Sequence, residues 1–197
     1  MTKNSILFVI AMFNLTIASA QVKLEKIKGS KIVTVTTKEV ESFENVEIEE
    51  FLDVYFVKSE KTSIEIEADD NLHDIISYNV LGNTLKLTAL KQPTGEKKLA
   101  IRVNYNDSLK TIVARHESKI NALADISLEN ITIKNFDKSQ SFLNIRSTNF
   151  TLIMTDKSKA EINVKADKTV VELSKDAKVK GLIASPEAKI DLYQKAE

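Results

Sequence analysis

The sequence lacks cysteine and tryptophan altogether, and it has only four glycines and two prolines among its 197 residues. Without cysteine the chain can form no disulfide bond and can carry no lipid on a cysteine at a processing site. Phosphate-binding loops, dinucleotide fingerprints and serine nucleophile elbows need glycines at fixed positions, and four glycines are too few to build them. These site classes are excluded, and burial of apolar side chains must stabilise the fold.

Histidine is also scarce. His73 and His116 lie far apart in the sequence, and no pair of histidines has the spacing of a metal site. We interpret both as surface or turn residues. Together with the shortage of cysteine and glycine, this predicts no catalytic residue, no cofactor and no metal ligand, so we do not expect an enzyme.

The chain has no excess of charge of one sign, because 28 lysines and arginines balance 28 aspartates and glutamates. These charges are interspersed along the sequence. A nucleic-acid-binding protein usually carries a basic stripe or patch, so we expect no nucleic acid among the partners.

Long apolar runs are missing as well, except near the N-terminus. There an apolar stretch from Ile6 to Phe13 is followed by the small residues Ala18-Ser19-Ala20. This pattern predicts a secretory signal peptide over residues 1–20, because the stretch is shorter than the roughly 20 residues that span a bilayer. A retained anchor helix is the alternative. We expect an exported protein of the periplasm or the cell surface, with no membrane span after signal cleavage.

The rest of the chain alternates apolar and polar residues with a period of two, which predicts half-buried β-strands. Residues 21–39 are expected to be an N-terminal extension or a first strand, and residues 40–105 a strand-rich N-terminal half. The stretch from Asp70 to Ile76 predicts one helical turn. Gly82-Asn83 predicts a tight hairpin turn, and Pro93-Thr94-Gly95 predicts a second turn or an exposed loop.

Residues 106–197 contain a repeat of about 19 residues in two registers. Such a repeat is typical of stacked architectures in which each residue packs on its own copy in the next repeat. The first predicted ladder consists of Ile126, Ile145, Val164 and Ile183, and the second of Ile133, Leu152, Val171 and Ile190. We therefore predict an all-β protein, a right-handed parallel β-helix or a related β-solenoid.

The polar residues of the repeat are interpreted as turn and ladder residues. Asn144 and Asn163 occupy the same repeat position, and stacked asparagines can hydrogen-bond along the axis. Asp137-Lys138-Ser139 recurs as Asp156-Lys157-Ser158, and aspartate and serine side chains commonly bond the backbone of tight turns. We expect turn chemistry at these positions and no ligand contact.

Two groups of carboxylates are candidates for a cation site or for acid/base chemistry, and their members are Glu47, Glu49, Glu50 and Asp53, and Glu65, Glu67, Asp69 and Asp70. Strand alternation places most of them opposite buried neighbours, which predicts a solvated face. Asp69-Asp70-Asn71 is the better cation candidate because it lies in a predicted turn. It lacks the remaining ligands of a calcium loop.

Four stretches carry a resemblance to a known family, and they are FENVEIEEFLDVYFV at 43–57, IEIEADDNL at 64–72, NVLGNTLKL at 79–87 and LKTIVARHESKI at 109–120. From about Val40 to Leu192 the chain resembles the family called putative auto-transporter adhesin, head GIN domain, whose members are secreted proteins of the Bacteroidetes type. The resemblance implies a β-helix-like fold, an adhesin-like role and no catalytic residues. Members usually have Gly-Ser-Gly at each corner, and the glycine-free corners here suggest wider or less strained turns.

The expected function is that of a non-enzymatic cell-envelope or surface protein, a binding module that holds an unknown protein or glycan ligand on a flat, polar strand face. Arg146 and Lys165, one repeat apart, are candidate residues of such a face. The alternative is a periplasmic structural or assembly module that acts by self-association or partner binding at an exposed end. A polysaccharide-degrading enzyme is a weaker third reading, because the repeats are few and hold no convergent acidic or basic cluster.

Overall fold

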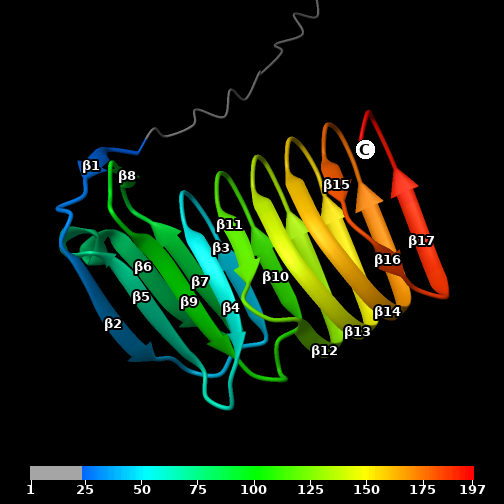
Figure 1. Cartoon of the computed structure of the whole chain (residues 1–197), viewed down its shortest axis with the longest axis horizontal. Coiled ribbons are helices and arrows are strands. Elements are labelled where there is room, and N and C mark those ends of the chain that lie inside the picture. The colour runs from blue at the N-terminus through cyan, green and yellow to red at the C-terminus, as the bar shows by residue number, and fades with distance from the viewer. Residues whose placement is uncertain (1–23) are drawn as a thin grey trace, which may run out of the picture.

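The computed structural model describes residues 24–197 and confirms an all-β protein (Figure 1). The predicted signal peptide, residues 1–20, lies outside the described residues. The elements of the first half are β1 (Lys26–Lys28), β2 (Val33–Glu39), β3 (Asn45–Ile48), β4 (Asp53–Lys58), β5 (Ser63–Asp69), the 3-10 helix η1 (Asp70–Ile75), β6 (Ile76–Leu81), β7 (Thr84–Ala89), β8 (Gln92–Thr94) and β9 (Leu99–Tyr105). The elements of the second half are β10 (Thr111–Ala114), β11 (Lys119–Ala122), β12 (Ile126–Asn135), β13 (Gln140–Met154), β14 (Lys159–Leu173), β15 (Lys178–Lys180), β16 (Ile183–Ala184) and β17 (Glu187–Leu192).

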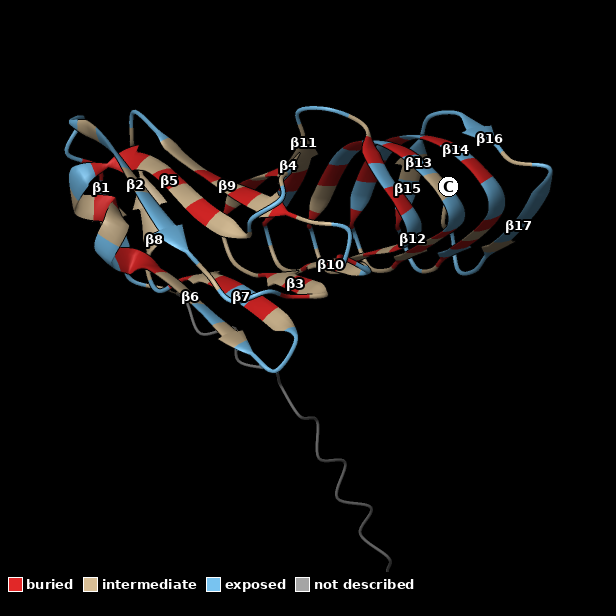
Figure 2. Cartoon of the chain, turned by 90° about the horizontal axis from the view of Figure 1, so that it is seen from below, coloured by how far each residue is buried: buried red, intermediate tan, exposed pale blue. Residues whose placement is uncertain are grey.

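One curled sheet of 15 strands contains every strand except β1 and β8, which pair with each other. Its main path runs β2-β5-β9-β4-β11-β13-β12-β10-β3-β7-β6. We call β2, β5, β9, β4 and β11 the first limb, and β10, β3, β7 and β6 the second limb. The two limbs face each other across buried side chains (Figure 2).

The long strands join the two limbs. The start of β13 pairs with β11 of the first limb, whereas the rest of β13 pairs with β12, whose end pairs with β10 of the second limb. A single strand of 15 residues therefore passes from one limb to the other. The sheet curls because its central strands bend.

The prediction of a right-handed parallel β-helix or β-solenoid is wrong. The sheet is a curled open sheet, a half-barrel, which ends at β2 on one side and at β6 on the other. Three of its pairings, β2 with β5, β5 with β9 and β6 with β7, are antiparallel. The repeat suggested uniform parallel winding, but strands that lie outside the repeat complete the sheet and pair in both directions.

The 19-residue register inside the sheet is confirmed. The parallel pairs of the first ladder are Ile126 with Ile145, Ile145 with Val164, and Val164 with Ile183. Those of the second ladder are Ile133 with Leu152, Leu152 with Val171, and Val171 with Ile190. The members inside the stack are buried, whereas Ile183 and Ile190, in the last repeat, are 37% and 54% exposed. Like residues pack on like along the axis until the repeats end.

The turns between repeats are glycine-free and left-handed. His116, Asp137, Asp156 and Lys175 have φ values of 55°, 59°, 64° and 58°. Left-handed backbone is unfavourable for residues with a Cβ, so the expectation of less strained corners is wrong. Aspartate tolerates this conformation better than most residues, which fits its recurrence at two of the corners.

The predicted asparagine ladder is confirmed, and the predicted turn bond is confirmed at Ser158 but not at Ser139, whose buried Oγ has no hydrogen-bond partner among the described residues. Asn163 Nδ2 donates to Asn144 Oδ1 at 3.0 Å, one repeat away. Ser158 Oγ donates to the Thr155 carbonyl oxygen at 2.8 Å, and Ser118 Oγ makes the same bond to Arg115. These side chains satisfy groups of the fold itself.

The local signals of the first half are confirmed in part. Asp70–Ile75 form the helical turn η1, and Gly82, at φ 59°, lies in the turn of the β6–β7 hairpin. Pro93, however, lies in β8 and pairs with Ile27, so only Gly95 belongs to the expected turn. Proline is tolerated in β8 because this short strand belongs to a two-stranded sheet and has an unpaired side.

Candidate binding face

The outward residues of the first limb and of the strands that continue it form a broad polar surface, which we call the outer strand face. Two rows of side chains cross it, because neighbouring strands place paired residues side by side, ~4.8 Å apart. The first, the lysine row, consists of Asp53, Lys119, Gln140, Lys159 and Lys178. The second, the aromatic row, consists of Arg102, Tyr55, Asn121, Phe142, Glu161 and Lys180.

Strand alternation sets the direction of these side chains. Ile120 and Ala160 are buried in the core, so Lys119 and Lys159 beside them point outward. Within residues 24–197, neither of these two lysines has a carboxylate within 4.0 Å. Lys178, by contrast, is paired with Glu197 at 2.7 Å. The lysine row therefore carries positive charge that the described part of the protein does not neutralise by direct pairing.

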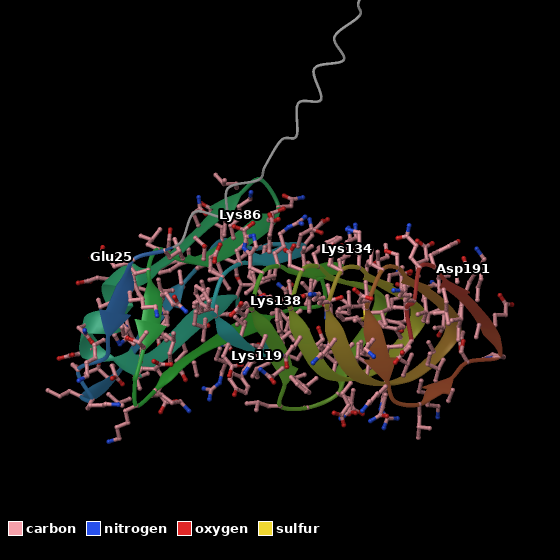
Figure 3. The ribbon with its side chains drawn as sticks, turned by 90° about the horizontal axis from the view of Figure 1, so that it is seen from above. Glu25, Lys86, Lys119, Lys134, Lys138 and Asp191 are labelled. Carbon is pink, nitrogen blue, oxygen red and sulfur yellow. The ribbon has the colours of Figure 1, made fainter. Side chains whose placement is uncertain are left out.

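The lysine row borders two shallow depressions, of about 260 and 490 Å³. Both are lined by Gln140, Lys159 and Lys178. The first is completed mainly by Phe142, Glu161 and Lys180, and the second by Lys138, Lys157 and Asp176 from the turns. In Figure 3, Lys119 lies on the side of the first limb and Lys134 on the opposite side, with Lys138 between them. The two depressions adjoin at their shared lining residues, and we call them together the trough.

Phe142 is the most unusual residue of the aromatic row. It lies on an outward position of β13, between the inward Ser141 and Leu143, and its side chain is 41% exposed. Its neighbours in the row are Asn121 and Glu161, both polar. An exposed phenyl ring gains free energy when a ligand covers its apolar surface. It also offers a flat apolar face beside hydrogen-bonding groups.

The other end of the aromatic row is held by ion pairs and hydrogen bonds. Arg102 pairs with Glu65 at 2.5 Å, and Asn121 Nδ2 donates to the Asp53 carboxylate. The Tyr55 hydroxyl donates to the same carboxylate at 3.4 Å. Burial raises the pKa of Tyr55, and the neighbouring charge of Asp53 raises it further. These contacts fix the side chains that a ligand would meet next to Phe142.

The structure places the candidate pair Arg146 and Lys165 side by side in register on β13 and β14. Both side chains are exposed, and Arg146 is paired with Asp125. They lie farther along these strands than Phe142 and Glu161, and their side chains point to the same outer face of the sheet. They extend the outer strand face, but they do not line the trough.

Most of the carboxylates that the sequence offered as cation ligands are engaged within the fold; among the described residues, the Glu49 side chain has no ion pair or hydrogen bond. Glu47 contacts Arg115 at 3.2 Å and Lys86 at 3.4 Å, and Glu67 contacts Lys98 at 3.3 Å. Within residues 24–197, no three histidine, aspartate or glutamate side chains are grouped so as to hold a metal ion. These clusters are the basic–acidic contacts of a sheet surface.

Asp69 has a structural role that the sequence did not reveal. Its side chain is fully buried and accepts hydrogen bonds from the backbone N–H groups of Lys31, Lys97 and Lys98, at 2.8 to 3.1 Å. Burial by itself would raise the pKa of Asp69, but the three N–H donors outweigh it and hold the pKa below its ordinary value. A Cβ on Gly29 would clash with this carboxylate and with the Glu96 backbone, so the contact requires glycine there. Asp69 ties three segments together.

The two histidines lie apart, at the positions expected of surface and turn residues. His73, in η1, lies 2.9 Å from the Thr34 hydroxyl, and His116, in a turn, lies 2.8 Å from Glu50. No helix in the described part of the chain has the length and apolar character needed to cross a membrane.

The fold and the outer strand face define an all-β protein built on a curled open sheet, with a broad polar strand surface. The chain belongs to the family described as putative auto-transporter adhesin, head GIN domain, whose model matches residues 42–192. This confirms the resemblance seen in the sequence. No protein of curated function matches the chain.

Solved structures share the fold at low sequence identity. A putative adhesin from Parabacteroides distasonis ATCC 8503 is 14% identical, with a TM-score of 0.72 over 87% of this chain and 83% of that one. A putative lipid binding protein from the same organism is 12% identical, with a TM-score of 0.57 over 88% and 98%. A putative adhesin from Bacteroides fragilis NCTC 9343 is 18% identical, with a TM-score of 0.50 over 87% and 100%. These similarities establish the architecture.

Proposed function

We propose that the protein is a non-enzymatic binding module of the cell envelope, exported and displayed at the cell surface, which holds its ligand on the outer strand face. The observation that carries this proposal is the continuous pair of rows across that face, with uncompensated lysines beside an exposed phenyl ring. Membership of a family described as adhesins supports the same reading.

The proposed location is tested on intact cells. A protease that does not penetrate the outer membrane is added to whole cells and to lysed cells, and the protein is followed by immunoblot. Degradation on intact cells is the expected result. Protection until lysis would place the protein in the periplasm and would contradict display at the surface.

The proposed role of the outer strand face is tested by attachment. Purified protein is applied to cell-surface extracts of glycan and protein, and the variant Phe142→Ala is compared with Lys168→Gln. Lys168 is an exposed lysine in the part of β14 that continues toward the second limb, and it does not line the trough. It is therefore a matched surface control. We expect Phe142→Ala to lose attachment and Lys168→Gln to keep it. Equal attachment of both variants would show that the outer strand face is not the binding site.

A second function, assembly by self-association, is favoured by the last repeat. Within residues 24–197, β17 pairs with β14 only, and Ile190, Leu192 and Tyr193 are 54%, 53% and 56% exposed. An exposed strand edge with apolar side chains is a template for pairing with another chain. In an antiparallel pairing of two copies centred on Ile190, Lys189 of each copy faces Asp191 of the other.

Self-association is tested by sedimentation over a wide range of protein concentration. We expect dimers that Ile190→Lys abolishes, because this substitution places like charges opposite each other at the centre of the pairing. A monomer at every concentration would reject the assembly function and would leave the binding proposal intact.

A further inference from the structure

We infer that the trough along the lysine row binds an acidic polysaccharide, with anionic groups on the lysines and a sugar ring on Phe142. This inference rests on the proposed binding function and names the class of its ligand. It is carried by the trough's shape, charge and exposed aromatic ring together.

The first step of the argument is charge. Lys119 and Lys159 lie two strands apart in the lysine row, with Gln140 between them, which separates them by about 10 Å. Lys157 and Lys180 add further ammonium groups on the rim and, like them, have no carboxylate within 4.0 Å in the described residues. Two ammonium groups about 10 Å apart in one row, with two more on the rim, fit a linear acidic polymer that lies along the row, because a lysine can meet a charged sugar at every second or third unit.

The second step is the chemistry between the charges. Gln140 presents an amide group, which donates and accepts hydrogen bonds, Asn121 presents its amide oxygen because Asp53 holds its Nδ2, and Phe142 presents an apolar ring beside them. A sugar ring has hydroxyl groups on its rim and an apolar C–H face, so it needs amides at its edge and an aromatic ring against its face. The aromatic row offers this combination directly beside the lysine row.

The third step separates a polysaccharide from other polyanions. The lysines border adjoining depressions of about 260 and 490 Å³, which can take the sugar units of a single chain. The flat surface of a bilayer would meet only the rim of such a trough.

Binding to polygalacturonate, a linear uronic acid polymer, tests the inference. The purified protein is titrated with this polymer, with neutral dextran, and with vesicles of phosphatidylglycerol and phosphatidylcholine. We expect binding to polygalacturonate alone, and weakening as salt is raised, because exposed charges are screened beyond about 8 Å at physiological ionic strength.

Variants assign the binding to the trough. Lys159→Gln is expected to weaken binding about threefold to fivefold, and Lys119→Gln combined with Lys159→Gln about tenfold or more, as for exposed charge contacts. Phe142→Leu keeps an apolar side chain but removes the flat ring, and it is expected to weaken binding about as much as Phe142→Ala. The control Lys168→Gln is expected to bind as the unaltered protein does. All these positions are on the surface, and thermal denaturation of each variant verifies that it folds.

The outcomes separate the inference from the function on which it rests. Binding to dextran or to vesicles that depends on Phe142 would overturn the acidic polysaccharide and would keep the outer strand face as the binding site. Polygalacturonate binding that is unchanged in the lysine variants would overturn the trough. Absence of binding to every probe, with attachment to cell extracts still lost in Phe142→Ala, would overturn the inference alone, whereas attachment that no variant alters would overturn the proposed function as well.

Discussion

Truncating an inner ladder residue should lower the free energy of unfolding much more than truncating the equivalent residue in the last repeat. Leu152 and Ile190 occupy the same repeat position, and each faces the interior, but Leu152 is 1% exposed and Ile190 is 54% exposed. Leu152 lies between Ile133 and Val171, so it has a buried neighbour on both sides. Ile190 packs on Val171 from one side only among the described residues.

The magnitudes follow from burial. Leu152→Ala removes a fully buried side chain and leaves a cavity between two ladder neighbours, which typically costs about 2 to 5 kcal/mol. Ile190→Ala removes a side chain that is already about half in water, so about half of the usual burial value is lost, roughly 1 kcal/mol. For a chain of this length each kcal/mol lowers the melting temperature by about 2 to 4 °C.

Urea denaturation followed by circular dichroism measures both costs in the same buffer. We expect Leu152→Ala to cost at least about twice as much as Ile190→Ala. The comparison is made at low protein concentration, because dimers formed through β17 would bury Ile190. Equal costs at that concentration would refute the reasoning, since the two residues would then be equally buried in solution.

Three further predictions concern the core, the turns and pH. Ile145→Asp should unfold the repeats, because it places an unpaired charge at a position that is 2% exposed, whereas Lys157→Ala should leave the melting temperature nearly unchanged; equal melting temperatures would contradict the register. Lys175→Gly should be about 0.5 to 1 kcal/mol more stable in denaturant titrations than Lys175→Ala, which also lacks the ion pair with Asp156, because glycine accepts φ 58° without strain, and equal stabilities of these two variants would contradict this account of the turns. Because the pKa of Asp69 is lowered in the folded state, its carboxylate stabilises the fold above the unfolded pKa of about 4, and this contribution is lost as the pH falls through the folded pKa. Asp69→Asn should therefore be less stable at neutral pH and less sensitive to acid, as urea midpoints at about pH 7 and pH 3 will show; an unchanged acid sensitivity would exclude this carboxylate as its source.

The repeat made the second half readable from the sequence. Ile145 stacks on Val164 because each residue packs on its own copy in the next repeat. The spacing in the sequence therefore predicts which residues pair in the folded sheet. The first half has no such spacing. Ile64 pairs with Val103 and Lys38 in antiparallel directions, and nothing local in the sequence fixes pairings across such distances. The parallel β-helix prediction failed because it applied the parallel repeat of the second half to the whole chain.

The binding face was readable only in part for the same reason. Phe142 and Glu161 are one repeat apart, and the outward phase of Phe142 between Ser141 and Leu143 is visible in the sequence. Tyr55 joins the same row through Asn121, from a segment that lies far earlier in the chain. Sequence reasoning therefore found a polar strand face but not the aromatic row, which depends on non-local strand pairing.

Because β12, β13 and β14 pair in one constant register, whole repeats can be removed or added without changing how the remaining strands pair. Every residue of β13 in the ladder pairs with a copy 19 positions later, and with a residue 19 positions earlier where β12 extends. Removal of residues 140–158 would join Ser139 to Lys159 and set β14 directly on β12 with the same faces inward. The sheet would become one strand narrower, by ~4.8 Å, and the proposed trough would lose Gln140, Phe142 and Lys157. Duplication of the same segment would instead add a second copy of these residues to the face without any redesign of the interior.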